Sequence, residues 1–209
     1  MEKLGLLGDT IRLEPLEPHH AGDLATAASV DPSLYQWSPV PQGAEAAASY
    51  IATANAWRDA GTAMPFAIVR LDDGAVIGST RFWNIERWAW PSRHARHGRP
   101  SPDACEIGYT WFTASAIRTV ANTEAKYLML CHAFDRWDVL RVCLHTDARN
   151  ARSQAAIERI GGRREGILRA HRMAADFTPR DSVRYSIVAG DWPETKRRLA
   201  GLMKRQKPS

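Results

Sequence analysis

The chain has 209 residues, of which 44% are hydrophobic and 24% charged, and its net charge is +5. This length suits one domain with its own core, and the composition excludes a disordered or fibrous chain. No apolar run reaches the roughly 18 residues that cross a bilayer, and the N-terminus lacks a signal-peptide pattern. We therefore expect a cytoplasmic protein without a membrane partner.

The cysteine pattern points the same way. Cys105, Cys131 and Cys143 form no CxxC pair and are odd in number, so we expect buried reduced thiols rather than a disulfide framework or a zinc site. His94 and His97 have no third ligand at a suitable spacing, and we predict no metal.

Basic residues concentrate at the C-terminal end. Residues 191–209 hold six basic and two acidic side chains. A solvated helix face explains this charge, and a weak contact with RNA is the alternative. The rest of the chain is nearly neutral, so we expect no nucleic-acid partner.

Strands and helices are predicted along the first half from periodicity and turn signals. Asp72-Asp73-Gly74 is a turn between two apolar runs and predicts a hairpin. The expected elements are a strand at 10–16, helices at 18–30 and 44–60, and hairpin strands at 65–70 and 76–83.

The second half begins with a long irregular segment, 86–103, rich in Trp, His, Arg and Pro. Loops of this length tend to be functional or mobile. After it we expect strands at 104–113, 141–146, 163–172 and 182–188, and helices at 120–137 and 150–160, with a terminal helix opening at 191–194. No repeat or linker interrupts this order, which predicts an α/β domain built on one sheet.

The stretch from Trp111 to Lys126 carries the clearest chemistry. A strand ends, a short turn follows and a helix begins, so the amides of Thr119 to Glu124 lie in a first helical turn without intrahelical partners. Such amides and the helix dipole can bind a pyrophosphate, with Arg118 adding a cation. Because every helix start offers free amides, an ordinary strand–turn–helix remains the alternative.

Four segments in order narrow this choice. They are Glu106–Thr113, Arg118–Lys126, Asp147–Ser153 and Ile160–Gly166, and together they resemble the GCN5-related N-acetyltransferases (GNAT), in particular the RimJ/RimL-type branch that acetylates ribosomal-protein N-termini. The resemblance spans about residues 10–190, with 191–209 as a basic helix that is part of the domain or appended to it. It implies a mixed, mostly antiparallel sheet of about seven strands, splayed between strands four and five and flanked by helices.

The resemblance also implies a site for acetyl-CoA. The pyrophosphate loop falls on Arg118, Thr119, Val120, Ala121, Asn122 and Thr123, where Ala121 and Thr123 replace the family's small permissive residues. The backbone of Trp111, Phe112 and Thr113 would hold the pantetheine and polarise the thioester. Asn150 would bind the pantetheine, although a plain helix N-cap explains it equally well.

The proton-transfer groups are less clear. Ile157 occupies the position of the family's tyrosine and cannot donate a proton, so Ser153 is the substitute for stabilising the thiolate, with helix capping as its other explanation. His145, Glu106 and His171 are the three candidate bases for the attacking amine. Each of these also has a structural explanation.

The acceptor side maps, by the resemblance, to residues 35–41, 83–103 and 173–180. Trp37, Trp83 and Trp88, with His171, are the candidate substrate-binding residues, although core packing or a homodimer contact also explains tryptophans. Arg93, Arg96 and Arg99 would attract an acidic acceptor or simply be solvated.

We therefore predict transfer of an acetyl group from acetyl-CoA to a primary amine, such as a protein N-terminus, by direct attack in a ternary complex. Two alternatives stay open. One is an acyltransferase for a small-molecule amine or a longer acyl donor, and the other is a non-catalytic binding module that contacts RNA or protein.

Overall fold

Eight strands form one sheet in the order β1-β2-β3-β4-β5-β6-β8-β7 in the computed structural model, which describes residues 4–174 and 176–206. Every neighbouring pair is antiparallel except β5 and β6, which are parallel. The strands are β1 (Leu6–Leu7), β2 (Ile11–Pro15), β3 (Met64–Arg70), β4 (Val76–Glu86), β5 (Ala104–Phe112), β6 (Arg141–Asp147), β7 (Arg163–Met173) and β8 (Pro179–Val188). The mixed, splayed sheet expected from the sequence is confirmed, with the two-residue β1 added at its edge.

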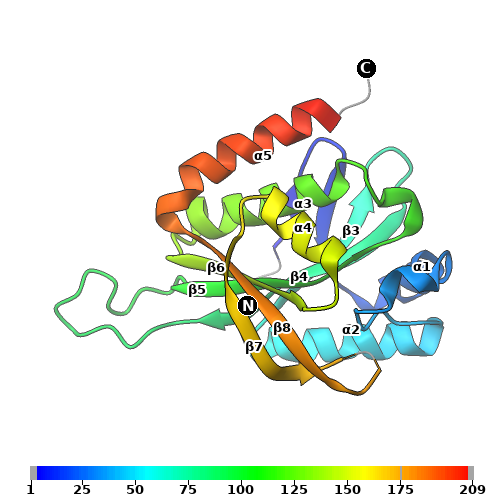
Figure 1. Ribbon diagram of the computed structural model, residues 1–209, viewed down its shortest axis with the longest axis horizontal. Coiled ribbons are helices and arrows are strands. Elements are labelled where there is room, and N and C mark those ends of the chain that lie inside the picture. Colours follow the sequence, from blue (N-terminus) through cyan, green and yellow to red (C-terminus); the bar gives the residue numbers. More distant parts are fainter. Residues whose placement is uncertain (1–3, 175, 207–209) are drawn as a thin grey trace.

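Within the described residues, five α-helices cover the two faces of this sheet (Figure 1). They are α1 (Ala21–Ser29), α2 (Ala44–Asp59), α3 (Ala121–Cys131), α4 (Ala151–Arg159) and α5 (Trp192–Gln206). The helix expected to run to Trp137 instead ends at Cys131 and continues as one π-helical turn, His132–Arg136.

Strand β3 explains how the two faces are held together. Its residues Met64 to Val69 are all buried, because Phe66 and Ile68 point to the cluster under α3 while Ala67 and Val69 point to the cluster under α1 and α2. A strand buried on both faces has a continuous apolar sequence rather than an alternating one.

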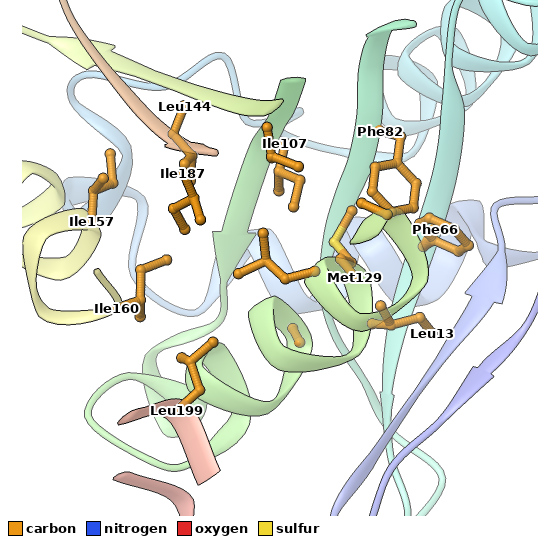
Figure 2. Close-up of a cluster of buried hydrophobic side chains, with 14 of the residues drawn as sticks. Leu13, Phe66, Phe82, Ile107, Met129, Leu144, Ile157, Ile160, Ile187 and Leu199 are labelled. Carbon is orange, nitrogen blue, oxygen red and sulfur yellow. The ribbon is translucent and has the colours of Figure 1, made fainter. Parts of the chain in front are cut away.

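The larger cluster joins the sheet to the three C-terminal helices. Figure 2 shows Phe66 and Phe82 from the sheet beside Met129 of α3. Ile157 of α4, Ile160 just after that helix and Leu199 of α5 complete the cluster. Its members are almost inaccessible to solvent. This packing holds α3 and α4 against the sheet, and the candidate site lies at the starts of these two helices.

Candidate active site

Strands β5 and β6 separate soon after they meet. They pair only over Ala104–Glu106 and Arg141–Cys143, while β5 continues to Phe112 paired with β4 alone. Tyr109 has φ 51° where the β4–β5 register shifts, which marks a bulge. The edge of β5 that faces β6 therefore has backbone groups without a sheet partner from Ile107 onward, somewhat earlier than the Trp111–Thr113 stretch expected for this role.

A cavity of about 620 Å³ opens where the strands separate. Its walls come from β5, β6, the first turns of α3, helix α4, the 34–40 loop and the β7–β8 hairpin. Ten sequence-predicted site residues line it: Trp37, Glu106, Trp111, Phe112, Arg118, Thr119, Asn122, His145, Asn150 and Ser153. The others lie behind or away from this wall: Thr113, Val120, Ala121, Thr123, Trp83, Trp88 and His171.

The turn before α3 is shaped by Arg118 and Thr119. Arg118 is exposed and has φ 65°, a conformation that non-glycine residues seldom adopt. Thr119 Oγ1 donates to the Ala116 carbonyl at 2.8 Å and accepts from the Ala121 amide at 3.2 Å. Of the amides expected to be free, that of Ala121 thus has a partner, and that of Glu124 bonds to the Val120 carbonyl. The strain falls on Arg118, so Ala121 begins the helix normally.

Buried Thr123 has a different role from the one its position in the phosphate loop suggested. Its Oγ1 accepts from both Nη1 and Nη2 of Arg159, each at 3.1 Å. Arg159 lines the cavity from α4 and so brings a second cation close to the start of α3. Sequence reasoning missed Arg159, although it lies one heptad after Arg152 on the cavity side of an amphipathic helix.

Helix α4 begins at the cavity. The side chain of Asn150 accepts from the Ser153 amide at 3.0 Å, which is N-capping geometry, and both residues line the cavity. The cap uses the Asn150 carbonyl oxygen and leaves its NH₂ group to donate elsewhere. Ile157, one turn further on, is buried at the cavity wall.

Glu106 and His145 meet at the point of strand separation. Nδ1 of His145 lies 3.1 Å from Oε1 of Glu106, although obliquely for a hydrogen bond, and no partner for Nε2 occurs among the described residues. Arg172 binds the same carboxylate through two contacts of 2.9 and 3.3 Å. Burial opposes ionisation of Glu106, but His145 and Arg172 together hold its pKa below the usual value. The carboxylate is charged and fully engaged.

His171 and Trp83 stand directly behind this pair. The rings of His171 and His145 are 5.0 Å apart, and burial and the Arg172 charge lower the pKa of His171. Trp83 packs edge-on against Tyr109, which lines the cavity, with centroids 5.5 Å apart. These residues support the wall rather than form its surface.

The 86–103 loop projects away from the body of the protein (Figure 1). Trp88 donates its indole N–H to Glu86 within this loop. Arg96 and Arg99 bind Asp138 at 3.0 and 2.8 Å. Arg96 and Arg99 thus hold the loop in place and are engaged by an acidic residue of this chain.

Comparison with known proteins identifies a family and several solved structures that share this fold. Residues 10–163 match the model of the acetyltransferase (GNAT) domain, whereas none of the curated proteins matches the chain. A GCN5-related N-acetyltransferase from Brucella melitensis superposes with a TM-score of 0.81 at 24% identity, covering 97% of this chain and 86% of its own. Mycobacterium smegmatis RimJ in complex with CoA-disulfide gives a TM-score of 0.74 at 22% identity, covering 92% and 88%.

A ribosomal-protein-S5-alanine acetyltransferase from Vibrio fischeri has the same fold, with a TM-score of 0.68 at 15% identity over 90% of this chain and 98% of its own. The chain belongs to the GNAT acetyltransferase family. It is accordingly an N-acetyltransferase that moves an acetyl group from acetyl-CoA to an amine. Within residues 4–174 and 176–206, every helix is too short or too polar to cross a membrane.

Proposed function

We propose that the acceptor is the N-terminal α-amine of a protein or peptide, and that it attacks the thioester directly in a ternary complex. The observation that carries this proposal is the imidazole–carboxylate pair of His145 and Glu106 in the cavity wall where β5 and β6 separate. An α-amine has a pKa near 8, against about 10.4 for a lysine side chain, so an imidazole can deprotonate it readily.

The roles of the pair follow from its contacts. Glu106 is ionised and already binds Arg172, so it orients the imidazole and stabilises its charged form, while His145 takes the proton from the amine. Nε2 is enclosed in the wall, and the amine would reach it through one water or after a small rotation of the ring.

The cofactor side fits acetyl-CoA on three observations. Arg118 and Arg159 provide cations at the start of α3, which suit a pyrophosphate. The unpaired edge of β5 supplies backbone groups for the pantetheine and for the thioester carbonyl. Asn150 has an NH₂ group to donate, and the Ser153 hydroxyl lines the cavity where it can hydrogen-bond the leaving sulfur.

The first test measures acetyl-CoA binding through its effect on the melting temperature of the protein. Arg118 is exposed and has no ion-pair partner among the described residues, so Arg118→Glu should fold normally yet abolish the rise in Tm that acetyl-CoA causes in the unmodified protein. Arg93→Glu, on the exposed part of the 86–103 loop, is the matched control and should keep the rise. A rise that survives Arg118→Glu would contradict the phosphate site.

The second arm identifies the acceptor by mass spectrometry. Three amines are compared: a peptide with a free N-terminus, the same peptide with a blocked N-terminus and an internal lysine, and a polyamine. We expect acetylation of the first alone. Transfer only to the lysine or the polyamine would make the protein a side-chain or small-molecule acetyltransferase, and preference for a longer acyl-CoA would change the donor.

A further inference from the structure

Lys126 lies in an unusual environment for a lysine. It is on α3, its exposed fraction is 6%, and it lines the same cavity as His145. Its Nζ donates to Thr110 Oγ1 at 2.6 Å, and Thr110 Oγ1 lies 2.8 Å from Thr80 Oγ1. An ammonium group has three donors, and this hydroxyl is the single partner found for them among the described residues.

A carboxylate would normally accompany such a buried cation. No ion pair with Lys126 occurs in residues 4–174 and 176–206, and burial alone lowers its pKa to about 7. The charged and titratable groups around it on the cavity wall have other partners or lie at its mouth. They are Glu106 and Tyr109 on β5, His145 and Asp147 on β6, Arg152 and Arg159 on α4, Arg172 on β7, Arg180 on β8 and Arg118 before α3. An uncompensated buried charge is costly, so this arrangement needs an explanation other than stability.

The position of Lys126 suggests one. Helical rise places it about 7.5 Å along α3 from Ala121 at the phosphate end. Its partner Thr110 lies on β5 between Phe112 and the Glu106 at which the strands separate. Lys126 therefore lines the same cavity as the phosphate end and the Glu106–His145 pair, and we expect the pantetheine of bound acetyl-CoA to pass close to it.

The reaction needs a proton donor at that place. Ile157 has no proton to give, and the serine hydroxyl of Ser153 can hydrogen-bond a thiolate but is too weak an acid to protonate it. We propose that Lys126 is the proton donor to the leaving CoA thiolate, an assignment that rests on the proposed function. Lys126 would thus be a catalytic residue that contacts the reacting sulfur.

The step balances as follows. The acceptor nitrogen forms a bond to the acetyl carbon, and the C–S bond breaks with its electron pair on sulfur. His145 takes the proton from the amine, and Lys126 gives a proton to the sulfur, which leaves as the free thiol. Lys126 ends neutral and regains a proton from solvent. Both the proton acceptor, His145, and the proton donor, Lys126, line the cavity.

The test uses Lys126→Met and Lys126→Gln in the full chain. Both should bind acetyl-CoA with little change in KM, while kcat falls by about 100-fold, the usual range for loss of a general acid. The decline of kcat at alkaline pH, which reports deprotonation of Lys126 in the unmodified protein, should disappear. Glutamine keeps a donor for Thr110, so it separates proton transfer from hydrogen bonding.

Two further readouts do not depend on turnover. Without ligand, Lys126→Met should melt at a higher temperature than the unmodified protein at pH 6, because it removes an unpaired buried charge. CoA bound to the unmodified protein should lose its thiol proton at a lower pH than CoA bound to Lys126→Gln, measured by the ultraviolet absorbance of the thiolate. Lys196→Met, which removes an ion pair with Asp135 on the outer surface, is the control and should leave kcat and the thiol titration unchanged.

The inference fails if both variants keep kcat within a few fold, or if Lys126→Met unfolds or loses acetyl-CoA binding, since Lys126 would then be structural. Failure of the proposed function looks different: the unmodified protein would acetylate no N-terminal amine, whereas the melting and thiol titration would still report on Lys126.

Discussion

His145 is held from two sides, by the Glu106 carboxylate at Nδ1 and by the His171 ring. A carboxylate at one ring nitrogen favours the tautomer whose other nitrogen is free to accept a proton. The same carboxylate is shared with Arg172, which keeps it charged. At the scale of single residues, the two roles are therefore divided: His145 moves the proton, and Glu106 orients the His145 ring.

This division of roles predicts that substitutions of His145 and His171 have different effects on kcat. His145→Gln should lower kcat by about 100-fold, as expected for loss of a general base. His171→Gln, on β7 with its ring 5.0 Å from that of His145 but not on the cavity wall, should reduce kcat much less. Steady-state kinetics over pH with an N-terminal peptide acceptor would measure both. A larger loss in His171→Gln would transfer the role of base to that residue.

At the scale of elements, the site depends on how closely β4 and β5 approach. A Cβ on Gly78 of β4 would lie 2.1 Å from the Trp111 carbonyl oxygen, so only glycine fits. Trp111 and Phe112 belong to the part of β5 that lines the cavity. The end of β5 is thus positioned by a backbone contact rather than by side chains.

Gly78→Ala should therefore force β5 away from β4. We expect a loss of about 2 kcal/mol in the free energy of unfolding, within the range of overpacked sites, together with weaker acetyl-CoA binding. Urea denaturation and ligand titration would measure the two effects. Gly22→Ala is the matched control, because Gly22 is in α1 with open space around it, and helix propensity predicts a gain of up to about 1 kcal/mol there. Equal behaviour of the two variants would rule out the backbone contact.

The sequence predicted elements well where local pattern decides them. The apolar run of β3, the Asn150 cap and the order of strands and helices all depend on neighbouring residues. It could not predict contacts made over long distances, such as Arg99 with Asp138 or Arg159 with Thr123. Lys126 escaped notice for a related reason: a lysine in a helix is normally solvated, and only the packing of α3 against β5 buries it.

At the scale of the whole molecule, α5 completes the fold. Trp192 stacks on Phe134 with centroids 5.2 Å apart and donates to Asp135 at 2.6 Å. Arg198 donates to the Arg159 carbonyl at the end of α4 at 2.8 Å. The basic helix thus connects the π-helical turn that continues α3 to the end of α4. The first turns of α3 and α4 frame the cavity, and we propose that α5 is part of the catalytic domain rather than an appended tail.

Leu199 tests this proposal because it is fully buried in the main cluster (Figure 2). If α5 is integral, Leu199→Ala leaves a cavity between α5 and α3 and lowers the free energy of unfolding by about 3 kcal/mol, in one transition seen alike by circular dichroism and tryptophan fluorescence. Lys204→Ala on the exposed side of the same helix should change it by less than about 0.5 kcal/mol. An appended helix would instead melt separately, and Leu199→Ala would then leave the main transition unchanged. Because α5 holds the C-terminal end of α4, the integral arrangement also predicts weaker acetyl-CoA binding in Leu199→Ala than in Lys204→Ala.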